Sequence, residues 1–536
     1  MMGMYQWLAS RPLLACSAVC LLVLTARAAL LPWLHVPMPG VHDEFSYLLA
    51  ADTFASGRLA NPPHPFWEHF ESFHILQQPT YASKYQPLQG LVLAFGEKLF
   101  GQPWIGVWMS MGLMCAAICW MLQGWISPRL ALLGALLVAL HIGILSYWMN
   151  SYWGGAVPSI GGALMLGALP RIAFRENFGH AVTWAVGLVV LLNSRPYDGF
   201  VLGLITAAAL AGALRKNGMP FRSTALRVAL PAGAVLAIAA GFMAYYNYRV
   251  AGNALELPYQ AHERQYAVAS MLAWNSMRPE PVYHHAVMRE FWAVAHVEEA
   301  TAAKANLLTA FLIKLSRIYD FVFGLYPLLV PLLIWPYAIG TAEERLTVAL
   351  LGCYLLALAP ITGFEPHYAS AIVGLLVLRF LQSLDRLRGW QPTGKRLGLA
   401  LGVLFVLVIP FQFGRDLWFL WTGGEHPPRL AVARQHVVQM LESQPGQHVV
   451  LVRYAPRHNI LEEWVYNRAD IDAQPIIWAR EMGPEQDRPF TQYFRDRHIW
   501  LLEADQSPPK LTPYNAAART ASSDAPQALA LPGRFF

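Results

Sequence analysis

Long apolar segments constrain the fold of this sequence more than any other feature. A segment of about 20 apolar residues is long enough to cross a bilayer as a helix. Only 13% of the 536 residues are charged, whereas soluble domains carry roughly a quarter. The chain is therefore predicted to be an all-α polytopic membrane protein of about 11 spans. These spans are expected at residues 12–34, 104–126, 130–148, 155–170, 181–194, 199–214, 228–247, 319–339, 346–361, 369–385 and 397–413.

The distribution of Lys and Arg predicts how the chain is threaded through the membrane. Cytoplasmic loops carry an excess of basic residues, and every short inner loop is basic when the N-terminus is placed in the cytoplasm. The basic residues of these loops are Arg129, Arg171, Arg175, Arg215, Lys216, Arg222, Arg227, Arg345, Arg386, Arg388, Lys395 and Arg396. The short outer turns hold few such residues, with Arg195 as the exception. Three long segments, 35–103, 248–318 and the tail from residue 414, are therefore predicted on the outer face.

The tail differs in its pattern from the rest of the chain. Strand-like runs at 448–453 and 499–503 and a helical stretch at 429–443 predict a small α/β domain. The chain is thus divided into a transmembrane domain, 1–413, and an extracytoplasmic domain, 414–536. The last ~20 residues are predicted to be a loose end because their composition cannot bury enough apolar surface.

An acidic pair, Asp43-Glu44, follows the first apolar segment and the turn at 37–40. An ionised acid at the bilayer centre costs about 3 kcal/mol, so acids near the membrane need a physical reason. Asp43 could cap a helix predicted over 45–56, because a carboxylate there accepts backbone N–H groups. It could instead be a general base at the boundary between membrane and water. These residues alone leave both roles open.

Further elements follow the acidic pair in order within segment 35–103. They are an Ala-rich helix ending at Gly57, then Lys84 ahead of Pro87-Leu88, and an interfacial helix ending at Phe100-Gly101. This order resembles the first outer loop of the GT-C superfamily of glycosyltransferases, especially its family 39-like group. That group contains protein O-mannosyltransferases and the aminoarabinose transferases of lipid A. The resemblance covers residues 12–200 well and continues in topology to about residue 413, whereas the tail has no counterpart.

The resemblance implies a GT-C-like fold and an inverting glycosyltransferase in a bacterial-type inner membrane. It implies transfer of a sugar from a polyprenyl phosphate carrier to a glycan, lipid or protein acceptor on the outer face. Asp43 matches the general base of the superfamily by position, and Glu44 matches the supporting half of the pair. One carboxylate suffices for this chemistry, because a phosphate leaves as a stable anion and needs no second acid. The net charge of +6 is too dilute to indicate a nucleic-acid partner.

The resemblance also implies cations that bind the carrier phosphate. Lys84 stands where the family places a Lys before its Pro-Leu element, although Gln86 interrupts the usual double proline. Arg58 in the same segment, Arg195 at an outer turn, and His367 before a predicted span are further candidates. Arg195 could alternatively pair with Asp198, and His367 could be a satisfied polar residue at a helix start.

Residues of the acceptor or sugar site are expected at Asn150, Trp153 and Tyr47. The family often has an acid at the outer turn that holds Asn150, and its replacement argues against a strong divalent-metal site. The sequence therefore predicts no metal ligand and no certain cofactor, although a weakly bound divalent metal stays possible. The lipid-linked sugar is the expected donor substrate. Three histidines of segment 248–318, His262, His284 and His285, are predicted to be solvated loop residues. All five cysteines lie in apolar runs, which indicates core packing.

Two other kinds of protein share this pattern. One is a GT-C-fold protein that has lost catalysis, and the other is a transporter or assembly factor for envelope polysaccharide. A transporter is expected to show repeat symmetry and broken helices, which the sequence does not display. Its charges would lie along a path through the membrane, whereas Asp43, Lys84 and Arg195 are predicted at one membrane face.

Overall fold

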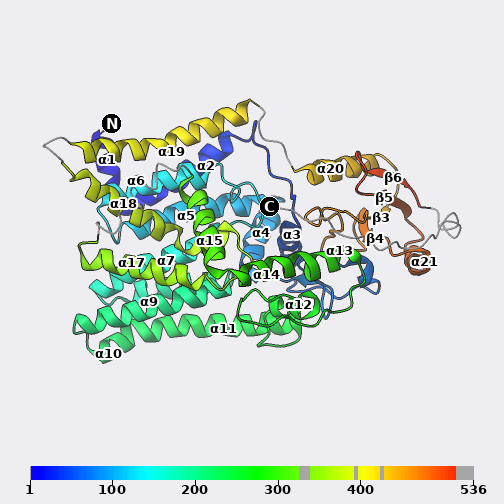
Figure 1. The fold of residues 1–536 in the computed structure, drawn as a ribbon, viewed down its shortest axis with the longest axis horizontal. Coiled ribbons are helices and arrows are strands. Elements are labelled where there is room, and N and C mark those ends of the chain that lie inside the picture. The colour runs from blue at the N-terminus through cyan, green and yellow to red at the C-terminus, as the bar shows by residue number, and fades with distance from the viewer. Residues whose placement is uncertain (1, 325–338, 392–395, 423–427, 515–536) are drawn as a thin grey trace.

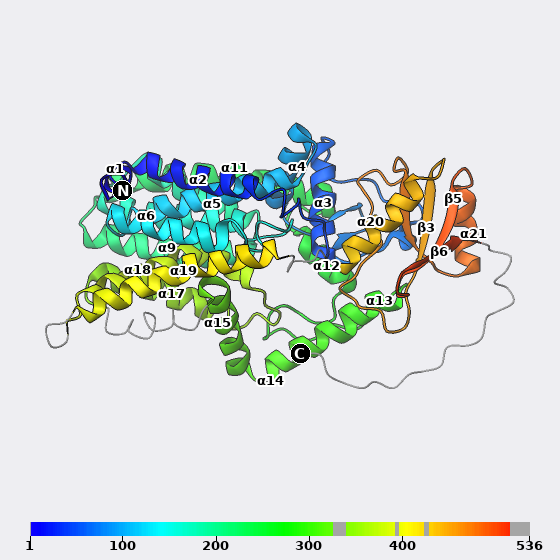
Figure 2. The same ribbon diagram turned by 90° about the horizontal axis from the view of Figure 1, so that it is seen from above.

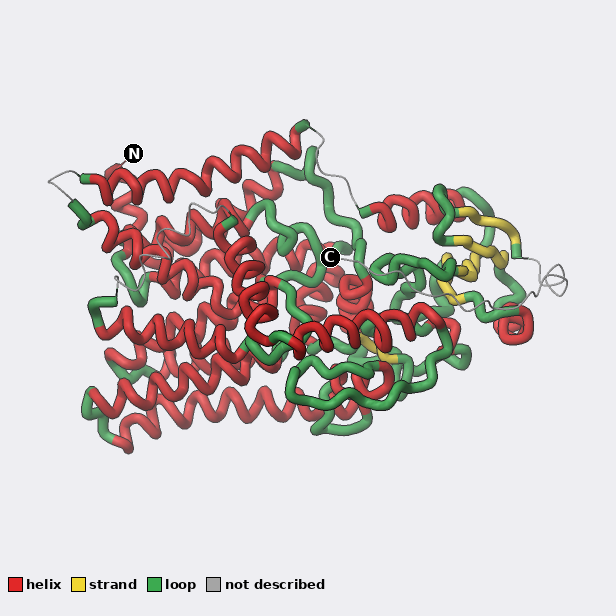
Figure 3. The backbone as a smooth tube through the Cα atoms, viewed as in Figure 1, coloured by secondary structure: helices red, strands yellow, loops and turns green. Residues whose placement is uncertain are grey.

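The helices of the chain form a bundle that carries a smaller sheet-containing part at one end (Figures 1 and 3). This computed structural model describes residues 2–324, 339–391, 396–422 and 428–514. The helices of the bundle and of the loops between its spans are α1 (Met2–Ala9), α2 (Pro12–Ala29), α3 (His42–Ala55), η1 (Trp67–Phe70), α4 (Pro87–Phe100), α5 (Trp104–Leu122), α6 (Pro128–Val138), η2 (Ala139–Gly143), α7 (Ala156–Phe174), α8 (Phe178–Leu192), α9 (Pro196–Lys216), α10 (Phe221–Thr224), η3 (Ala225–Ala229), α11 (Leu230–Ala251), α12 (Pro258–Tyr266), α13 (Ala286–Arg289), η4 (Glu290–Ala295), α14 (His296–Ala305), α15 (Leu307–Phe323), α17 (Ala342–Ala357), η7 (Pro366–Ile372), α18 (Val373–Arg388) and α19 (Leu397–Trp421).

Within the described residues, seven helical stretches are long and apolar enough to cross a membrane. They are α2, α5, α7, α9, the continuous stretch α10–η3–α11, the stretch η7–α18, and α19. Two shorter apolar helices, α6 with η2 and α8, lie beside them. The chain is an integral membrane protein, as predicted. The predicted span at 319–339 lies mostly outside the described residues. Among the described residues, the helices that are long and apolar enough to span number fewer than the predicted 11.

Small residues let the helices of the bundle approach closely, as in other membrane bundles. A Cβ atom added at Gly162 in α7 would lie 1.8 Å from the carbonyl oxygen of Ala371 in η7. One added at Gly106 in α5 would lie 2.1 Å from the carbonyl oxygen of Val92 in α4. The first of these glycines brings two spans together. The second fixes α4, the helix predicted at the membrane surface, against the bundle.

The outer segments lie between the bundle and the sheet. In both views α3 and α12 occupy this position (Figures 1 and 2). A short hairpin of β1 (Ile75–Leu76) and β2 (Ala82–Ser83) lies between α3 and α4 in sequence. The exposed residues Leu91, Phe95 and Leu99 form a stripe along α4, which fits the predicted interfacial helix.

The tail forms an α/β unit, as predicted. Its elements are α20 (Arg429–Glu442), β3 (His448–Arg453), β4 (Ile476–Arg480), α21 (Pro484–Tyr493), β5 (His498–Glu503) and β6 (Lys510–Pro513). The strand order is β4-β3-β5-β6, with β3 parallel to both β4 and β5 and β6 antiparallel to β5. The domain boundary at 413/414 stays a prediction, and α19 continues past it to Trp421.

The tail packs directly on the first outer segment. The rings of Phe45 in α3 and Tyr466 stack at 4.7 Å between centroids. Arg480 of β4 is fully buried, ion-pairs with buried Glu463, and donates a hydrogen bond of 2.6 Å to the carbonyl oxygen of Glu71. A buried charge that keeps a partner in this way ties the two parts of the chain together.

Replacing this buried cation is expected to destabilise the tail. Arg480→Met leaves the Glu463 carboxylate buried without its partner, which costs about 3 kcal/mol. That loss corresponds to a roughly 100-fold decrease in hydrogen-exchange protection of β3 and β4. The control is Arg468→Met, which removes an exposed guanidinium from Asp52 and Glu97 at the same junction and is expected to cost less than about 1 kcal/mol. Equal protection in the two variants would contradict an anchoring role for Arg480.

Candidate active site

Glu44 fixes the start of α3. One of its carboxylate oxygens accepts hydrogen bonds from the backbone N–H groups of Gly40 (2.7 Å) and Val41 (3.2 Å). The other accepts from the backbone N–H of Tyr152 (3.0 Å). Burial raises the pKa of Glu44 to about 7, although these hydrogen bonds act in the opposite direction. Glu44, and not Asp43, is therefore the residue that caps this helix.

Asp43 is directed to the other side of the helix start, toward aromatic and imidazole groups. The hydroxyl of Tyr85 donates a hydrogen bond to its carboxylate. The Nδ1 atom of His42 lies 3.1 Å from one carboxylate oxygen, and Nε2 of His74 lies 3.6 Å from the other. Burial disfavours ionisation, but the neighbouring His74 and His42 and the Tyr85 hydroxyl outweigh it and lower the pKa of Asp43 well below its usual value. Asp43 is therefore a carboxylate at neutral pH.

His74 is held in an unusual backbone conformation at this site. Its φ angle is 62°, in the left-handed region that non-glycine residues seldom adopt. Its carbonyl oxygen accepts hydrogen bonds from the Ser46 hydroxyl (2.7 Å) and from the backbone N–H of Lys84 (3.1 Å). Burial and the nearby Lys84 ammonium lower the pKa of His74 well below its usual value, so the ring is neutral at pH 7.

Lys84 joins the two long outer segments. Its Nζ atom lies 3.7 Å from a carboxylate oxygen of Glu263 in α12 and 4.6 Å from the ring centroid of Tyr259. The lysine is buried, and burial lowers its pKa in spite of the Glu263 charge. Asp43 also acts electrostatically on Lys84, so the predicted cation does lie near the predicted base.

Arg195 stands immediately before α9. Its Nε atom donates a 2.7 Å hydrogen bond to Asp198, and its guanidinium lies 4.1 Å from the ring centroid of Tyr368. The structure thus contains the Arg195–Asp198 ion pair, the alternative to a phosphate-binding role for Arg195 that the sequence left open. Tyr47, predicted for the acceptor site, stacks on Tyr85 at 4.3 Å and lies within electrostatic range of both Arg195 and Asp43.

His367 and Trp153 lie together beside Arg195. Their ring centroids are 4.8 Å apart, and the Tyr147 hydroxyl lies 3.2 Å from Nδ1 of His367. Arg195 and Asp43 both act electrostatically on His367. The site therefore brings together the predicted residues Asp43, Tyr47, Lys84, Trp153, Arg195 and His367.

Asn150 and Arg58 are placed differently. The amide of Asn150 accepts a hydrogen bond from Arg27 (3.1 Å) and donates to the carbonyls of Leu145 (3.0 Å) and Ser146 (3.1 Å). Its polar atoms are thus used within the protein. Arg58 follows the C-terminal end of α3, about 20 Å along the helix axis from Asp43, and in the described part of the chain its side chain makes no hydrogen bond or ion pair.

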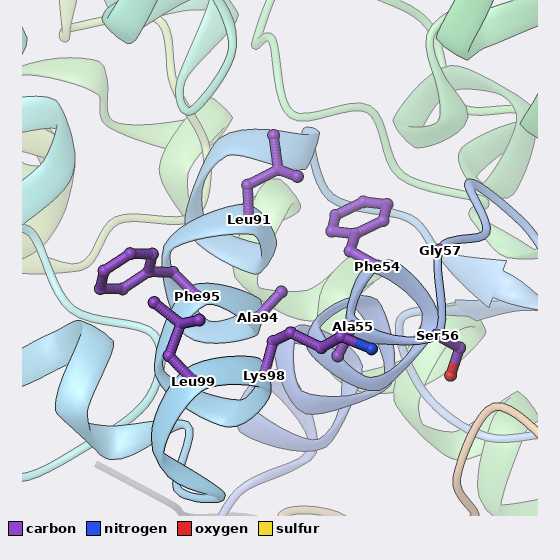
Figure 4. Close-up of a pocket in the computed structure, with 9 residues that line it drawn as sticks. All are labelled: Phe54, Ala55, Ser56, Gly57, Leu91, Ala94, Phe95, Lys98 and Leu99. Atoms are coloured by element: carbon purple, nitrogen blue, oxygen red, sulfur yellow. The ribbon is translucent and has the colours of Figure 1, made fainter.

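A hollow of about 420 Å³ separates the C-terminal halves of α3 and α4 (Figure 4). It is mostly apolar and lies at the end of α3 away from Asp43. Its lining residues are Phe54, Ala55, Ser56, Gly57, Leu91, Ala94, Phe95, Lys98 and Leu99. The hollow is therefore separate from the carboxylate and its cations.

The prediction that His262 is a solvated loop residue is wrong. His262 lies in α12, is 0% exposed, and its ring centroid is 5.2 Å from that of Trp292. Segment 248–318 folds over the site, so polar residues that look like loop residues are covered. The prediction is also wrong for His285, whose side chain is only 8% exposed and contacts the carbonyl of Glu68 (2.7 Å). His284 is more exposed and contacts a Glu71 carboxylate oxygen (2.9 Å).

The contacts of Asp43 with His42, His74 and Tyr85 were not anticipated from the sequence. His42 could have been noticed because it immediately precedes Asp43. His74 and Tyr85 come from either side of the β1–β2 hairpin, and only folding brings them to α3. One nitrogen of each of the two histidines and one oxygen of Asp43 all lie within 4.8 Å of one another, as the donors of a metal site do.

Comparison with solved structures identifies the fold. The ArnT structure from Cupriavidus metallidurans bound to undecaprenyl phosphate is 13% identical, with 91% of this chain and 92% of that chain covered and a TM-score of 0.50. Archaeal oligosaccharyltransferase AglB from Archaeoglobus fulgidus, in complex with an inhibitory peptide and a dolichol-phosphate, is 11% identical, with 92% and 69% covered and a TM-score of 0.50. This chain has the GT-C fold of these membrane proteins.

This chain spans only part of another similar structure, and comparisons of its sequence find no match. An apo structure of the Archaeoglobus fulgidus oligosaccharyltransferase is 11% identical and covers 82% of this chain, which spans only 62% of that protein's length, with a TM-score of 0.49. No protein-family model and no curated protein sequence gives a match. The likeness is thus one of fold.

Asn150 is expected to act in stability. Asn150→Ala removes three side-chain hydrogen bonds in a partly buried turn, and the free energy of unfolding should fall by about 2 kcal/mol. Thermal unfolding in detergent measures this loss. In the control Asn217→Ala, one exposed hydrogen bond to the Ala173 carbonyl is lost, and the loss should stay below about 1 kcal/mol. A fully stable Asn150→Ala protein would instead favour the predicted acceptor role.

Proposed function

We propose that this protein is an inverting membrane glycosyltransferase that moves a sugar from a polyprenyl phosphate carrier to an acceptor. The acceptor is an envelope glycan, lipid or protein on the outer face of a bacterial-type inner membrane. The observation that carries the proposal is the Asp43 carboxylate, partly shielded from water, which lies within electrostatic range of Lys84 and shares the neighbour Tyr47 with Arg195. An anionic base next to cations is the arrangement that proton removal and a phosphate leaving group require.

The reaction follows from these charges. The acceptor hydroxyl or amide attacks the anomeric carbon of the donor while Asp43 takes its proton. The bond between that carbon and the phosphate oxygen breaks, and the phosphate leaves with the bonding electrons as an anion. Lys84 and Arg195 stabilise this anion. Attack on the face opposite the phosphate inverts the anomeric configuration.

Several observations support the proposal beyond the carboxylate. ArnT and AglB, which share the fold, were solved with undecaprenyl phosphate and dolichol-phosphate respectively. Trp153 is partly exposed next to His367, and a sugar can pack on an indole ring there. The basic loops of the sequence predict a cytoplasmic N-terminus, and with it Asp43 and the tail on the outer face. Glu44 fixes the N-terminal end of α3 through three backbone N–H groups, and in the proposal it thereby positions Asp43.

The carrier-binding part of the proposal is tested with undecaprenyl phosphate as the probe. Arg195→Met and Lys84→Met each remove a cation, and a charged hydrogen bond is worth about 1.5–3 kcal/mol, so affinity should fall roughly 10- to 150-fold. Arg264→Met is the control, because this arginine is 64% exposed and pairs with Glu256; its affinity should be unchanged. Wild-type affinity in Arg195→Met, with thermal stability preserved, would contradict a phosphate site there.

The catalytic part is tested by Asp43→Asn. Loss of a general base should lower transfer by about 10²- to 10⁴-fold while undecaprenyl phosphate still binds. Mass spectrometry of envelope glycans from cells that produce each variant measures the transfer. Asp52→Asn is the control, since Asp52 lies on the same helix and pairs with Arg468. A full glycan profile in Asp43→Asn would remove Asp43 from the mechanism and favour a GT-C-fold protein without this chemistry.

A further inference from the structure

Two buried imidazole rings lie against the Asp43 carboxylate without proper hydrogen bonds to it. His42 and His74 are each 5% exposed. Nδ1 of His42 is 3.1 Å from Asp43, yet neither ring nitrogen of His42 has a hydrogen-bond partner among the described residues. Nε2 of His74 stands 3.6 Å from Asp43, and its Nδ1 also lacks a partner. Buried polar groups are normally hydrogen-bonded, so these unpartnered nitrogens point to a ligand that the protein itself does not supply.

The spacing of the three donors is that of ligands around one ion. Zinc–nitrogen and zinc–oxygen bonds of 2.0–2.2 Å in a tetrahedron place neighbouring donor atoms about 3.4 Å apart. Nδ1 of His42 lies 3.1 Å from one carboxylate oxygen of Asp43, and Nε2 of His74 lies 3.6 Å from the other, so each histidine nitrogen has a carboxylate oxygen near this spacing. All three donor atoms lie within 4.8 Å of one another. The side chains can therefore meet a single ion with small movements.

The donor set selects the kind of ion. Two imidazole nitrogens and one carboxylate oxygen suit Zn²⁺, whose sites with an open position commonly hold two histidines and one acid. Mg²⁺ and Ca²⁺ prefer shells made of oxygen. Neutral imidazole is the form of histidine that binds metals.

We propose that His42, Asp43 and His74 bind one Zn²⁺ ion. The site is distinct from the outer turn at Asn150, whose amide is used by Arg27 and two carbonyls. Ion binding requires only these three donors and not the proposed sugar transfer. A bound dication lowers the proton affinity of Asp43, so zinc and the acceptor's proton are expected to compete for the same carboxylate.

Metal binding is measured on the full-length protein, purified in detergent through a tag that contains no histidine. After treatment with EDTA and dialysis against a zinc buffer, elemental analysis is expected to find one Zn²⁺ per chain. Co²⁺ in place of Zn²⁺ should give the visible absorption bands of a four-coordinate site. His42→Ala and His74→Ala should each weaken binding at least about 10-fold. Asp43→Asn should do the same.

Two histidine variants serve as controls. His262→Ala removes a buried ring whose centroid is 6.3 Å from that of His74 but which is outside the donor set. His284→Ala removes one of the partners of the Glu71 carboxylate. Both should keep one Zn²⁺ per chain. Thermal unfolding identifies variants that fail to fold, and His74→Gln, which keeps a polar group of similar size, replaces His74→Ala if that protein is unfolded.

Any one of three results would overturn the proposal. The first is binding of less than about 0.2 Zn²⁺ per chain by the wild-type protein, which would mean that the rings serve only as neighbours of the carboxylate. Folded His42 and His74 variants could bind zinc as the wild type does. Zinc could also be lost in His284→Ala and kept in His74→Ala, which would place the ion at Glu71. Since the experiment contains neither sugar nor carrier, none of these results bears on the proposed glycosyl transfer.

Discussion

The three backbone N–H groups that bind Glu44 fix where α3 begins, and the candidate site is built from that point. Gly40 and Val41 precede the helix, while Tyr152 belongs to a turn more than a hundred residues later. The buried carboxylate therefore holds the first turn of α3 against the bundle. Asp43 is then left on the opposite side, where the outer segments meet. Two adjacent acids thus have different tasks, one in the scaffold and one in the site.

Much of the fold could be predicted because its signals are local or compositional. The apolar runs predict spans, and strand-like patterns at 448–453 and 499–503 correspond closely to β3 and β5. The fold class followed from the order of motifs after the first span. The number of spans could not be settled in the same way, since α8 and α6 with η2, both predicted as spans, are shorter than a bilayer-crossing helix needs to be.

The site could be predicted only in part, because its contacts join distant segments. Sequence position predicts Asp43, Lys84 and Arg195, and folding brings them within electrostatic range of one another or of Tyr47. The partners Glu263 and His74 give no signal in the sequence. The error at His262 has the same cause, since a polar, aromatic segment looks solvated until it is seen to cover the helix start. Arg58 shares a segment with Asp43 but lies beyond the other end of α3.

The stacking of Tyr466 on Phe45 has a consequence for how the protein matures. Phe45 lies two residues after Asp43, and Tyr466 belongs to a part of the chain that a ribosome makes late. The N-terminal end of α3 therefore lacks one of its packing surfaces while the bundle is already being inserted. The candidate site therefore reaches its full packing only after residue 466 has been synthesised and has folded onto α3.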